Sequence, residues 1–305
     1  MRDSALKPGA SRVSALTPNP SRVSALSAKE TTMAKERILV IGAHPDDCEI
    51  KAGGAAALWA KAGHVVRFVS ATNGGTGHHA IGGVELVGRR MEEAKNAAKV
   101  IGIESQVMEM TNGDLEPSLV YRKMFIKLIR EFKPTLVLTH RPNDYHPDHR
   151  YTSQLVQDSA FVVTVPNNLP TTPALRYNPV IAYLSDLFQK PIPFAPDVVV
   201  GIDDVLETKI DMMHCHVSQF YEWLPYNQQV EDQCPKGDRE RREWMKAQRI
   251  KYDANCADRY RGKLIELYGK RKGSKIKYAE AFEVCEYGSP MSLEKRHALF
   301  PFVKE

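Results

Sequence analysis

Cysteine is scarce in this sequence, and the few cysteines do not stand in pairs. The 305 residues include five of them, Cys48, Cys215, Cys234, Cys256 and Cys285, and none forms a Cys-x-x-Cys motif. This distribution excludes a disulfide-dense secreted scaffold and argues against a zinc site built from thiolates. Scattered single cysteines are typical of a reducing compartment, so we expect a cytoplasmic protein.

Long apolar runs are missing as well. Charged residues or proline interrupt every apolar stretch well before the roughly 18 consecutive residues that a membrane helix needs. The sequence therefore predicts a soluble protein without membrane insertion.

The chain also lacks a strong excess of one charge once its N-terminal segment is set aside. The net charge is +5, and residues 1–37 alone contribute +4 of it. A nearly neutral remainder gives no electrostatic basis for binding nucleic acid or an anionic membrane surface. We expect a small-molecule partner and no nucleic acid.

The first 35 residues are repetitive and poor in apolar side chains. Ser-Ala-Leu recurs at Ser4, Ser14 and Ser24, and three prolines lie among the repeats. Because so few apolar side chains cannot bury a core, we predict that residues 1–35 are a disordered N-terminal extension. Their basic, serine-rich composition has some likeness to a transit peptide, and Met33 is an alternative translation start.

From residue 36 onward, short apolar runs alternate with segments of helical pattern. Ile38 to Ile41 is a β-branched and aliphatic run, typical of a strand that is buried on both faces of a parallel sheet. Similar runs cover 65–71, 106–110 and 135–139, with helical patterns at 53–62, 89–100, 120–132 and 148–161. This alternation predicts an α/β protein with a Rossmann-like, three-layer α/β/α architecture and a mostly parallel sheet.

The second half of the chain has a coarser pattern. Two apolar runs, 180–184 and 198–202, are expected to add edge strands. Residues 236–272 are heavily charged and contain no proline, which predicts a long surface helix or a pair of helices. We therefore expect one domain over residues 36–305 with a helical C-terminal elaboration, in which a charged helical insertion lies around 220–270.

Two predicted strands are followed by loops of similar and unusual composition. Ala43-His44-Pro45-Asp46-Asp47 follows the run at 38–41, and His146-Pro147-Asp148-His149 lies in the loop after the run at 135–139. One His-Pro-Asp sequence alone is ordinarily a turn with an Asx hydrogen bond. Two of them at the carboxyl ends of parallel strands are expected to converge where α/β proteins bind ligands.

Together the two loops supply a set of metal ligands. His44, Asp47 and His149 offer two imidazoles and a carboxylate, which suits Zn²⁺ in a catalytic site with one position open for water. Asp46 cannot easily share the metal with its neighbour, but it could accept a proton from that water. The sequence thus predicts a zinc centre with a carboxylate base beside it.

These two motifs resemble the signature motifs of the LmbE-like (PIG-L) zinc deacetylases. Further similarity to this family lies in the glycine-rich segment 72–77, the Arg-x-x-Glu segment at 90–94, His-x-Ser-Gln at 216–219 and Tyr-Ala-Glu-Ala-Phe at 278–282. The resemblance implies a Rossmann-like fold and an enzyme that removes acetyl from N-acetylglucosamine-type substrates, as in bacterial deacetylases of small glucosaminides. The partner would be a small N-acetylated glucosaminide.

The resemblance also implies roles for individual residues. His44, Asp47 and His149 would be the zinc ligands, in agreement with the ligand types, and Asp46 would be the general base. A charged stretch between Phe220 and Gly269, longer than in similar enzymes, leaves the aglycone and a homo-oligomer interface open.

Three more roles follow from the resemblance. His146 would be the acid: as an imidazolium it would stabilise the oxyanion and then protonate the leaving amine. Asp148 would orient the ring of His146. Arg90 matches an arginine that binds on the substrate side in similar proteins.

Other functions compete with this interpretation. Two histidines and a carboxylate can also hold Fe(II) for oxygen chemistry, although a paired base and acid, Asp46 and His146, favour hydrolysis. A metal-dependent amidase with a non-sugar N-acyl substrate would use the same residues. A non-catalytic metal-binding protein would be expected to lack the base or the acid, and both are present. Dinucleotide binding is excluded, because His-Pro-Asp-Asp stands where Gly-x-Gly-x-x-Gly would be needed.

Overall fold

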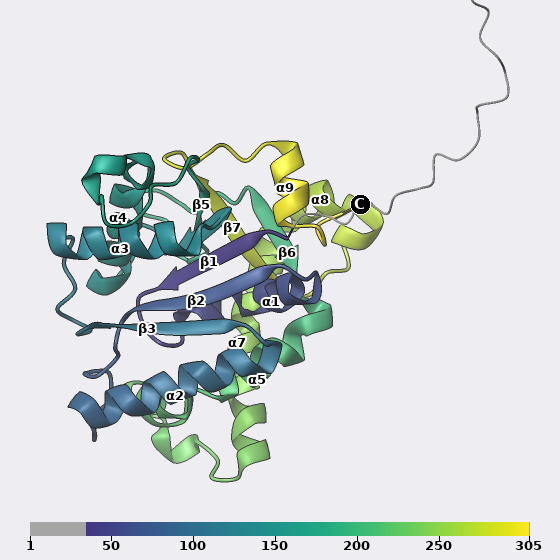
Figure 1. Cartoon of the computed structure of the whole chain (residues 1–305). Helices are drawn as coiled ribbons and strands as arrows, with labels where there is room; N and C mark the ends of the chain where they lie inside the picture. Colours follow the sequence, from purple (N-terminus) through teal and green to yellow (C-terminus); the bar gives the residue numbers. More distant parts are fainter. Residues whose placement is uncertain (1–34, 305) are drawn as a thin grey trace, which may run out of the picture. The chain divides into compact units, whose positions relative to one another are not determined.

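The apolar runs of the sequence become the strands of one sheet in the computed structural model, which describes residues 35–304 (Figure 1). The strand order is β3-β2-β1-β4-β5-β7-β6. The strands are β1 (Arg37–Gly42), β2 (Val65–Thr72), β3 (Glu104–Met110), β4 (Leu136–Thr139), β5 (Val180–Leu184), β6 (Val198–Gly201) and β7 (Ala279–Cys285). The prediction of disorder for the N-terminal extension falls almost wholly outside the described residues and stays a prediction.

Most of the sheet is parallel, as predicted. β1 pairs in parallel with β2 and β4, so that Val40 lies between Phe68 and Leu138. β2 also pairs in parallel with β3, and β4 with β5. β7 runs antiparallel to both β5 and β6. The order of the strands reverses between β1 and β4, and ligands of open α/β sheets bind at such a reversal.

Helices cover both faces of the sheet. Among the described residues they are α1 (Asp47–Lys61), α2 (Gly83–Ile101), α3 (Leu119–Phe132), α4 (Pro147–Ser159), α5 (Leu206–His214), α6 (Leu224–Asn227), α7 (Asp238–Arg259), α8 (Arg261–Gly273) and α9 (Leu293–Leu299). A π-helical segment, Ser218–Trp223, connects α5 to α6. In residues 35–304, no helix combines the length and the apolar character that crossing a membrane requires.

Alternate side chains of β1 enter two separate cores, which demonstrates the three layers. Ile38 and Val40 pack with residues of α1, α5 and α8, while Leu39 and Ile41 pack with residues of α3 and α4. All four side chains are completely buried. The view in Figure 1 shows α3 and α4 on one face of the sheet, and α1, α2, α5 and α7 on the other. The predicted three-layer α/β/α architecture is confirmed.

Two details of the sheet differ from the prediction. β5 is an interior strand, because the unpredicted strand β7 lies beside it and separates it from β6. Ala279 and Phe282 of β7 are buried, yet Glu280 is buried too, so the short run lacks a clean apolar pattern. Helix α2 begins at Gly83, earlier in the chain than the helical pattern predicted at 89–100.

Candidate active site

The two predicted loops meet at the reversal of strand order. The loop from Ala43 to Asp46 connects β1 to α1, and the loop from His140 to His146 connects β4 to α4. Asp47 is the first residue of α1, and Pro147 is the first residue of α4. Because β1 and β4 are adjacent and parallel, the two helix starts lie at the same edge of the sheet.

The three predicted metal ligands form a nearly equilateral triangle. Nδ1 of His44 lies 3.4 Å from Oδ2 of Asp47, which lies 3.5 Å from Nε2 of His149, and the two nitrogens are 3.3 Å apart. Tetrahedral ligands bound at about 2.0–2.1 Å are separated by about 3.3–3.4 Å. The spacing of these donor atoms therefore fits one metal ion of the size of zinc.

Each imidazole of the triangle has a carboxylate on its other nitrogen. Nε2 of His44 is 3.2 Å from Oδ2 of Asp148, and Nδ1 of His149 is 3.1 Å from Oδ1 of Asp144. These carboxylates accept the ring protons and leave the facing lone pairs for a metal, the usual arrangement around histidine ligands. The protonation of the two histidines thus suits a bound cation, as does the spacing of the three donor atoms.

The electrostatics of the cluster also favour a cation. Burial alone would lower the pKa of His44, but hydrogen bonds to Asp148 and Asp47 outweigh it and raise this pKa to about 9. Burial acts to raise the pKa of Asp47, yet His149 and His140 hold it well below its usual range. A dication bound here would take the place of the proton that His44 otherwise attracts.

His140 is a member of the cluster that sequence reasoning missed. Its ring stacks on His149 with centroids 4.0 Å apart, and its Nε2 accepts the Ala43 N–H at 3.0 Å. Burial lowers its pKa to about 4. It could have been suspected from its position directly after the buried strand β4, one residue before the loop that the motif marks.

Potential donor sets around the triangle overlap. His44, His146 and His149 gather their ring nitrogens within reach of one ion, and so do side-chain atoms of Asp47, His140 and His149. The triangle of His44, Asp47 and His149 shares members with both sets. In His140, however, Nε2 is already the acceptor for a backbone N–H.

Asp46 lies beside the cluster with its carboxylate free of helix capping. It occupies the N-cap position of α1 but makes no capping hydrogen bond, and it is 8% exposed. Its Oδ1 is 3.4 Å from Nη2 of Arg90. The carboxylate is therefore available for proton transfer at the edge of the pocket.

Arg90 is buried against Asp46, so it contacts the expected base. The side chain is 2% exposed and also lies 3.4 Å from the carbonyl of Gly74. Gly74 has φ +72°, and a Cβ there would come within 2.6 Å of Nη1 of Arg90. The glycine-rich segment thus makes room for this arginine.

His146 and Asp148 are arranged differently from the expectation. Nδ1 of His146 accepts the backbone N–H of Asp148 at 3.2 Å, while the carboxylate of Asp148 contacts His44. Burial and the neighbouring His44 and His149 lower the pKa of His146 to about 4. A neutral ring would therefore carry its proton on Nε2, and the backbone N–H of Asp148 contacts this ring. The roles that the resemblance implies for His146 and Asp148 stay predictions.

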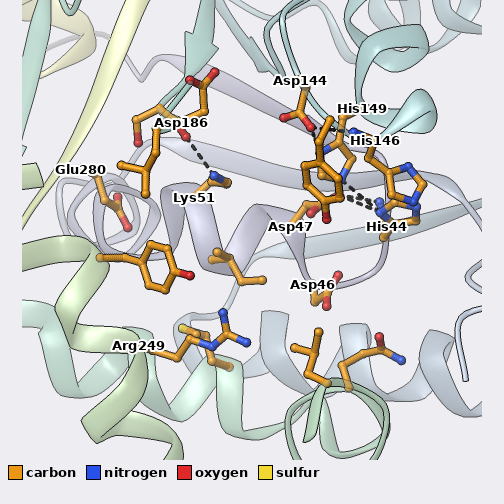
Figure 2. Close-up of a pocket in the computed structure, with 18 of the residues that line it drawn as sticks. His44, Asp46, Asp47, Lys51, Asp144, His146, His149, Asp186, Arg249 and Glu280 are labelled. Atoms are coloured by element: carbon orange, nitrogen blue, oxygen red, sulfur yellow. Dashed lines mark hydrogen bonds and ion pairs between the residues drawn. The ribbon is translucent and has the colours of Figure 1, made fainter. Parts of the chain in front are cut away.

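A cavity of about 670 Å³ opens beside the cluster. Figure 2 shows His44, Asp47, His146 and His149 at one end, with Asp46 next to them, and Glu280 at the other end. The volume of this cavity lies within the range of small-molecule binding sites. The site predicted from sequence is therefore the wall of a real pocket.

Comparisons with known proteins agree with this geometry. The family described as "PIG-L: GlcNAc-PI de-N-acetylase" matches residues 39–160, which contain both loops. A diacetylchitobiose deacetylase of Thermococcus kodakarensis is 30% identical over 206 residues, covering 63% of this chain and 74% of that protein. A 4-oxalmesaconate hydratase of Pseudomonas putida is 24% identical over 208 residues, covering 66% of this chain and 80% of the relative.

A solved structure shows the same fold. The N,N'-diacetylchitobiose deacetylase from Pyrococcus horikoshii superimposes with a TM-score of 0.65 at 22% identity, covering 86% of this chain and 88% of that one. The similarity in sequence to the archaeal deacetylase spans most of that relative. The family match over residues 39–160 includes both histidine motifs. This chain therefore belongs to the PIG-L family, as the two loops indicated.

Proposed function

We propose that the protein is a zinc-dependent hydrolase that removes an acetyl group from an N-acetylglucosamine-type substrate. The triangle of His44, Asp47 and His149, with carboxylates behind both imidazoles, is the observation that carries this proposal. Its relatives include deacetylases, one of which acts on diacetylchitobiose by its name. A zinc ion held by the triangle would polarise the amide carbonyl and make the attacking water more acidic.

Asp46 serves as the proton carrier in this proposal. It accepts a proton from the attacking water, and it then delivers that proton to the nitrogen of the breaking C–N bond. Arg90, 3.4 Å away, orients the carboxylate before the reaction. One carboxylate thus acts first as base and then as acid, and the released products are acetate and a free amine.

His146 stabilises charge in this scheme. Its Nδ1 is occupied by the Asp148 backbone N–H, so the neutral ring carries its proton on Nε2, where it can donate. A donor in this place would hydrogen-bond to the amide oxygen as that oxygen becomes negative. His146 therefore assists without having to be charged.

A hydratase is the second candidate function. The hydratase relative matches over a larger share of its own length than the deacetylase does, although its identity is lower. Addition of water to a carbon–carbon double bond would also use a base such as Asp46. The two reactions differ in their products, because only deacetylation releases acetate.

The test is a product assay with zinc-loaded protein. We expect acetate and free amine from N-acetylglucosamine, its methyl glycoside or diacetylchitobiose, with loss of activity after chelation and recovery on adding zinc. An N-acetylated amino acid tests for a non-sugar amidase, and an unsaturated carboxylic acid tests for hydration. Acetate release from none of the sugars, by a protein that does contain zinc, would contradict the proposal.

We also propose that the enzyme acts in the cytoplasm on a small glucosaminide. All five cysteines are free thiols, which supports a reducing compartment. A homo-oligomer is compatible with this function.

A further inference from the structure

The part of the pocket away from the metal ligands carries charges that the proposed reaction does not use. This distal part lies between α1, α7 and the loop that follows β5, and it is lined by Lys51, Asp186, Arg249 and Glu280 among others. In Figure 2, Lys51 and Arg249 lie between the metal-ligand cluster and Glu280. The question is which of these charges are already neutralised within the protein.

The acidic side chains of the distal part all have cationic partners. Asp186 accepts from Nε of Arg141 at 2.8 Å, and both side chains are buried. Nζ of Lys209 lies 2.7 Å from Asp253 and 2.9 Å from Glu280. Glu280 also accepts two backbone N–H groups at the middle of α1. These carboxylates are occupied, so they do not form a site for a cationic ligand.

Among the described residues, two of the cations that line the pocket, Lys51 and Arg249, have no such carboxylate partner. Lys51 donates to the backbone carbonyl of Ser185 at 2.9 Å, which uses one of its three protons. The Arg249 guanidinium carbon lies 4.9 Å from the centre of the Phe220 ring. Within residues 35–304, neither side chain has a carboxylate within 4.0 Å.

Arg249 is held without compensation in a half-buried position. Burial lowers its pKa, and Tyr252 and Asp46 oppose this only in part. A cation that is partly desolvated and unpaired is stabilised by any anion that enters the pocket. The stacking on Phe220 fixes the side chain but does not neutralise it.

We propose that the distal part of the pocket binds an anionic group of the substrate, a carboxylate or a phosphate, through Arg249 and Lys51. This inference rests on the proposed function, since it places the N-acetyl group at the metal ligands and the anion at the other end of the same molecule. Arg249 and Lys51 are then specificity-determining residues, which select an acidic glucosaminide over a neutral one. Arg249 belongs to α7, within the charged segment of the second half of the chain.

The kinetic test compares neutral and anionic substrates of similar size. We expect kcat/KM for the best of N-acetylglucosamine 1-phosphate, N-acetylglucosamine 6-phosphate and N-acetylmuramic acid to exceed that for N-acetylglucosamine by at least about tenfold. The phosphates and the lactyl carboxylate distinguish the two sources of charge. Equal kcat/KM values for neutral and anionic substrates would overturn the inference and leave the deacetylase proposal intact.

Variants assign the preference to residues. Arg249→Gln and Lys51→Gln should lose most of the preference for the anion, and Arg249→Lys should retain part of it because the charge remains. Arg239→Gln, an exposed arginine of the same helix outside the pocket, is the matched control and should behave as wild type. A preference that survives in both pocket variants would show that other groups bind the anion.

A binding measurement separates this inference from the proposed function. Zinc-loaded Asp46→Asn protein is titrated calorimetrically with the same phosphates and with N-acetylmuramic acid, so that no turnover is required. Binding that weakens about tenfold in Asp46→Asn/Arg249→Gln, but not in Asp46→Asn/Arg239→Gln, supports an anion site even if no sugar is deacetylated. Equal binding in both double variants would mean that Arg249 only packs against Phe220.

Discussion

Asp46 and Asp47 are neighbours in the sequence, but the start of a helix gives them different tasks. The carboxylate of Asp47 accepts the backbone N–H groups of Ala43 and His44 at 3.0 and 2.7 Å, which fixes it in the triangle. A Cβ at Gly42 would lie 2.7 Å from that of Asp47, so only glycine allows this approach. Asp46 accepts no such bond and faces Arg90 instead. We therefore expect Asp47 to hold a metal and Asp46 to exchange a proton.

The roles of the two aspartates can be separated by substitution. Asp46→Asn keeps the size of the side chain but removes its basicity, so we expect kcat to fall by about 10²–10⁴ while zinc is retained. Steady-state kinetics and elemental analysis of the same preparation measure both effects. An Asp46→Asn protein that loses its zinc would mean that Asp46 is a ligand.

A substitution at Asp148 tests whether this residue acts through His44 or through His146. Its carboxylate accepts from both His44 and the Gly113 N–H, at 3.2 and 2.7 Å. Asp148→Asn should therefore weaken zinc binding by about 10–100-fold, as loss of a partner behind a histidine ligand does. Asp158→Asn is the control, at a half-buried position of the same helix where the carboxylate lies 3.9 Å from Arg122. A loss of kcat with unchanged zinc affinity would instead connect Asp148 to His146.

At the scale of elements, the segments singled out in the sequence hold one another in place. Glu93 of α2 accepts the backbone N–H and the hydroxyl of Ser218, at 2.9 and 2.6 Å. Gln219 in the following π-helical turn donates to the carbonyl of Gly77 at 3.2 Å. The glycine-rich loop, α2 and the His-x-Ser-Gln segment thus form one support behind Asp46 and Arg90.

The glycine-rich loop gives a prediction with a close control. Gly74→Ala places a side chain on a left-handed backbone and against Arg90, so we expect the free energy of unfolding to fall by about 1–3 kcal/mol. We also expect a loss of activity, because Arg90 must move away from Asp46. Gly83→Ala has φ +60° but meets no atom within 4 Å, and should affect stability alone. Thermal unfolding and kcat are measured for both. Equal activity in the two variants would contradict this role of the loop.

The sequence predicts the parts of the site that lie in continuous motifs. The apolar runs of β1 and β4 locate the sheet edge, and the residue types after them identify His44, Asp46, Asp47 and His149. Groups recruited from a distance could not be seen. No local signal brings β7 between β5 and β6, or places Arg249 in the pocket, because these contacts join segments far apart in the chain.

At the scale of the whole described molecule, the two ends of the pocket draw mainly on different halves of the sequence, although Lys51 of α1 lines the distal end. The loops and helix starts that follow β1 and β4 supply the candidate metal ligands and the candidate base. The later elements α5, α7 and β7 supply the distal wall of the pocket. This chain is similar both to a relative named as a deacetylase and to one named as a hydratase.

The stability of the whole fold should depend on His64. Its Nδ1 accepts the Glu36 N–H at 3.1 Å, and burial lowers its pKa below the ordinary value of 6.5 although Glu36 opposes this. Below pH 6.5 the unfolded chain therefore binds a proton at His64 more readily than the folded chain does. The contribution of His64 to the free energy of unfolding is complete above pH 6.5 and declines as the pH falls.

A substitution at His64 checks this pH dependence. His64→Asn retains an acceptor for the Glu36 N–H but cannot titrate, so the unfolding free energy should fall less steeply with decreasing pH than in wild type. His297→Asn, at an exposed position near the C-terminus, should leave the slope unchanged. Chemical denaturation at a series of pH values gives both slopes, and an unaltered slope in His64→Asn would contradict the assignment.

The central claim is that His44, Asp47 and His149 hold one zinc ion and that Asp46 does not. The most direct test is the zinc content per chain, measured after removal of loosely bound metal, for wild type, Asp46→Asn and His149→Ala. We predict about one zinc in wild type and in Asp46→Asn, and almost none in His149→Ala, because two remaining ligands hold the ion poorly. Absence of bound transition metal from wild type after incubation with Zn²⁺, or equal loss in both variants, would contradict the account.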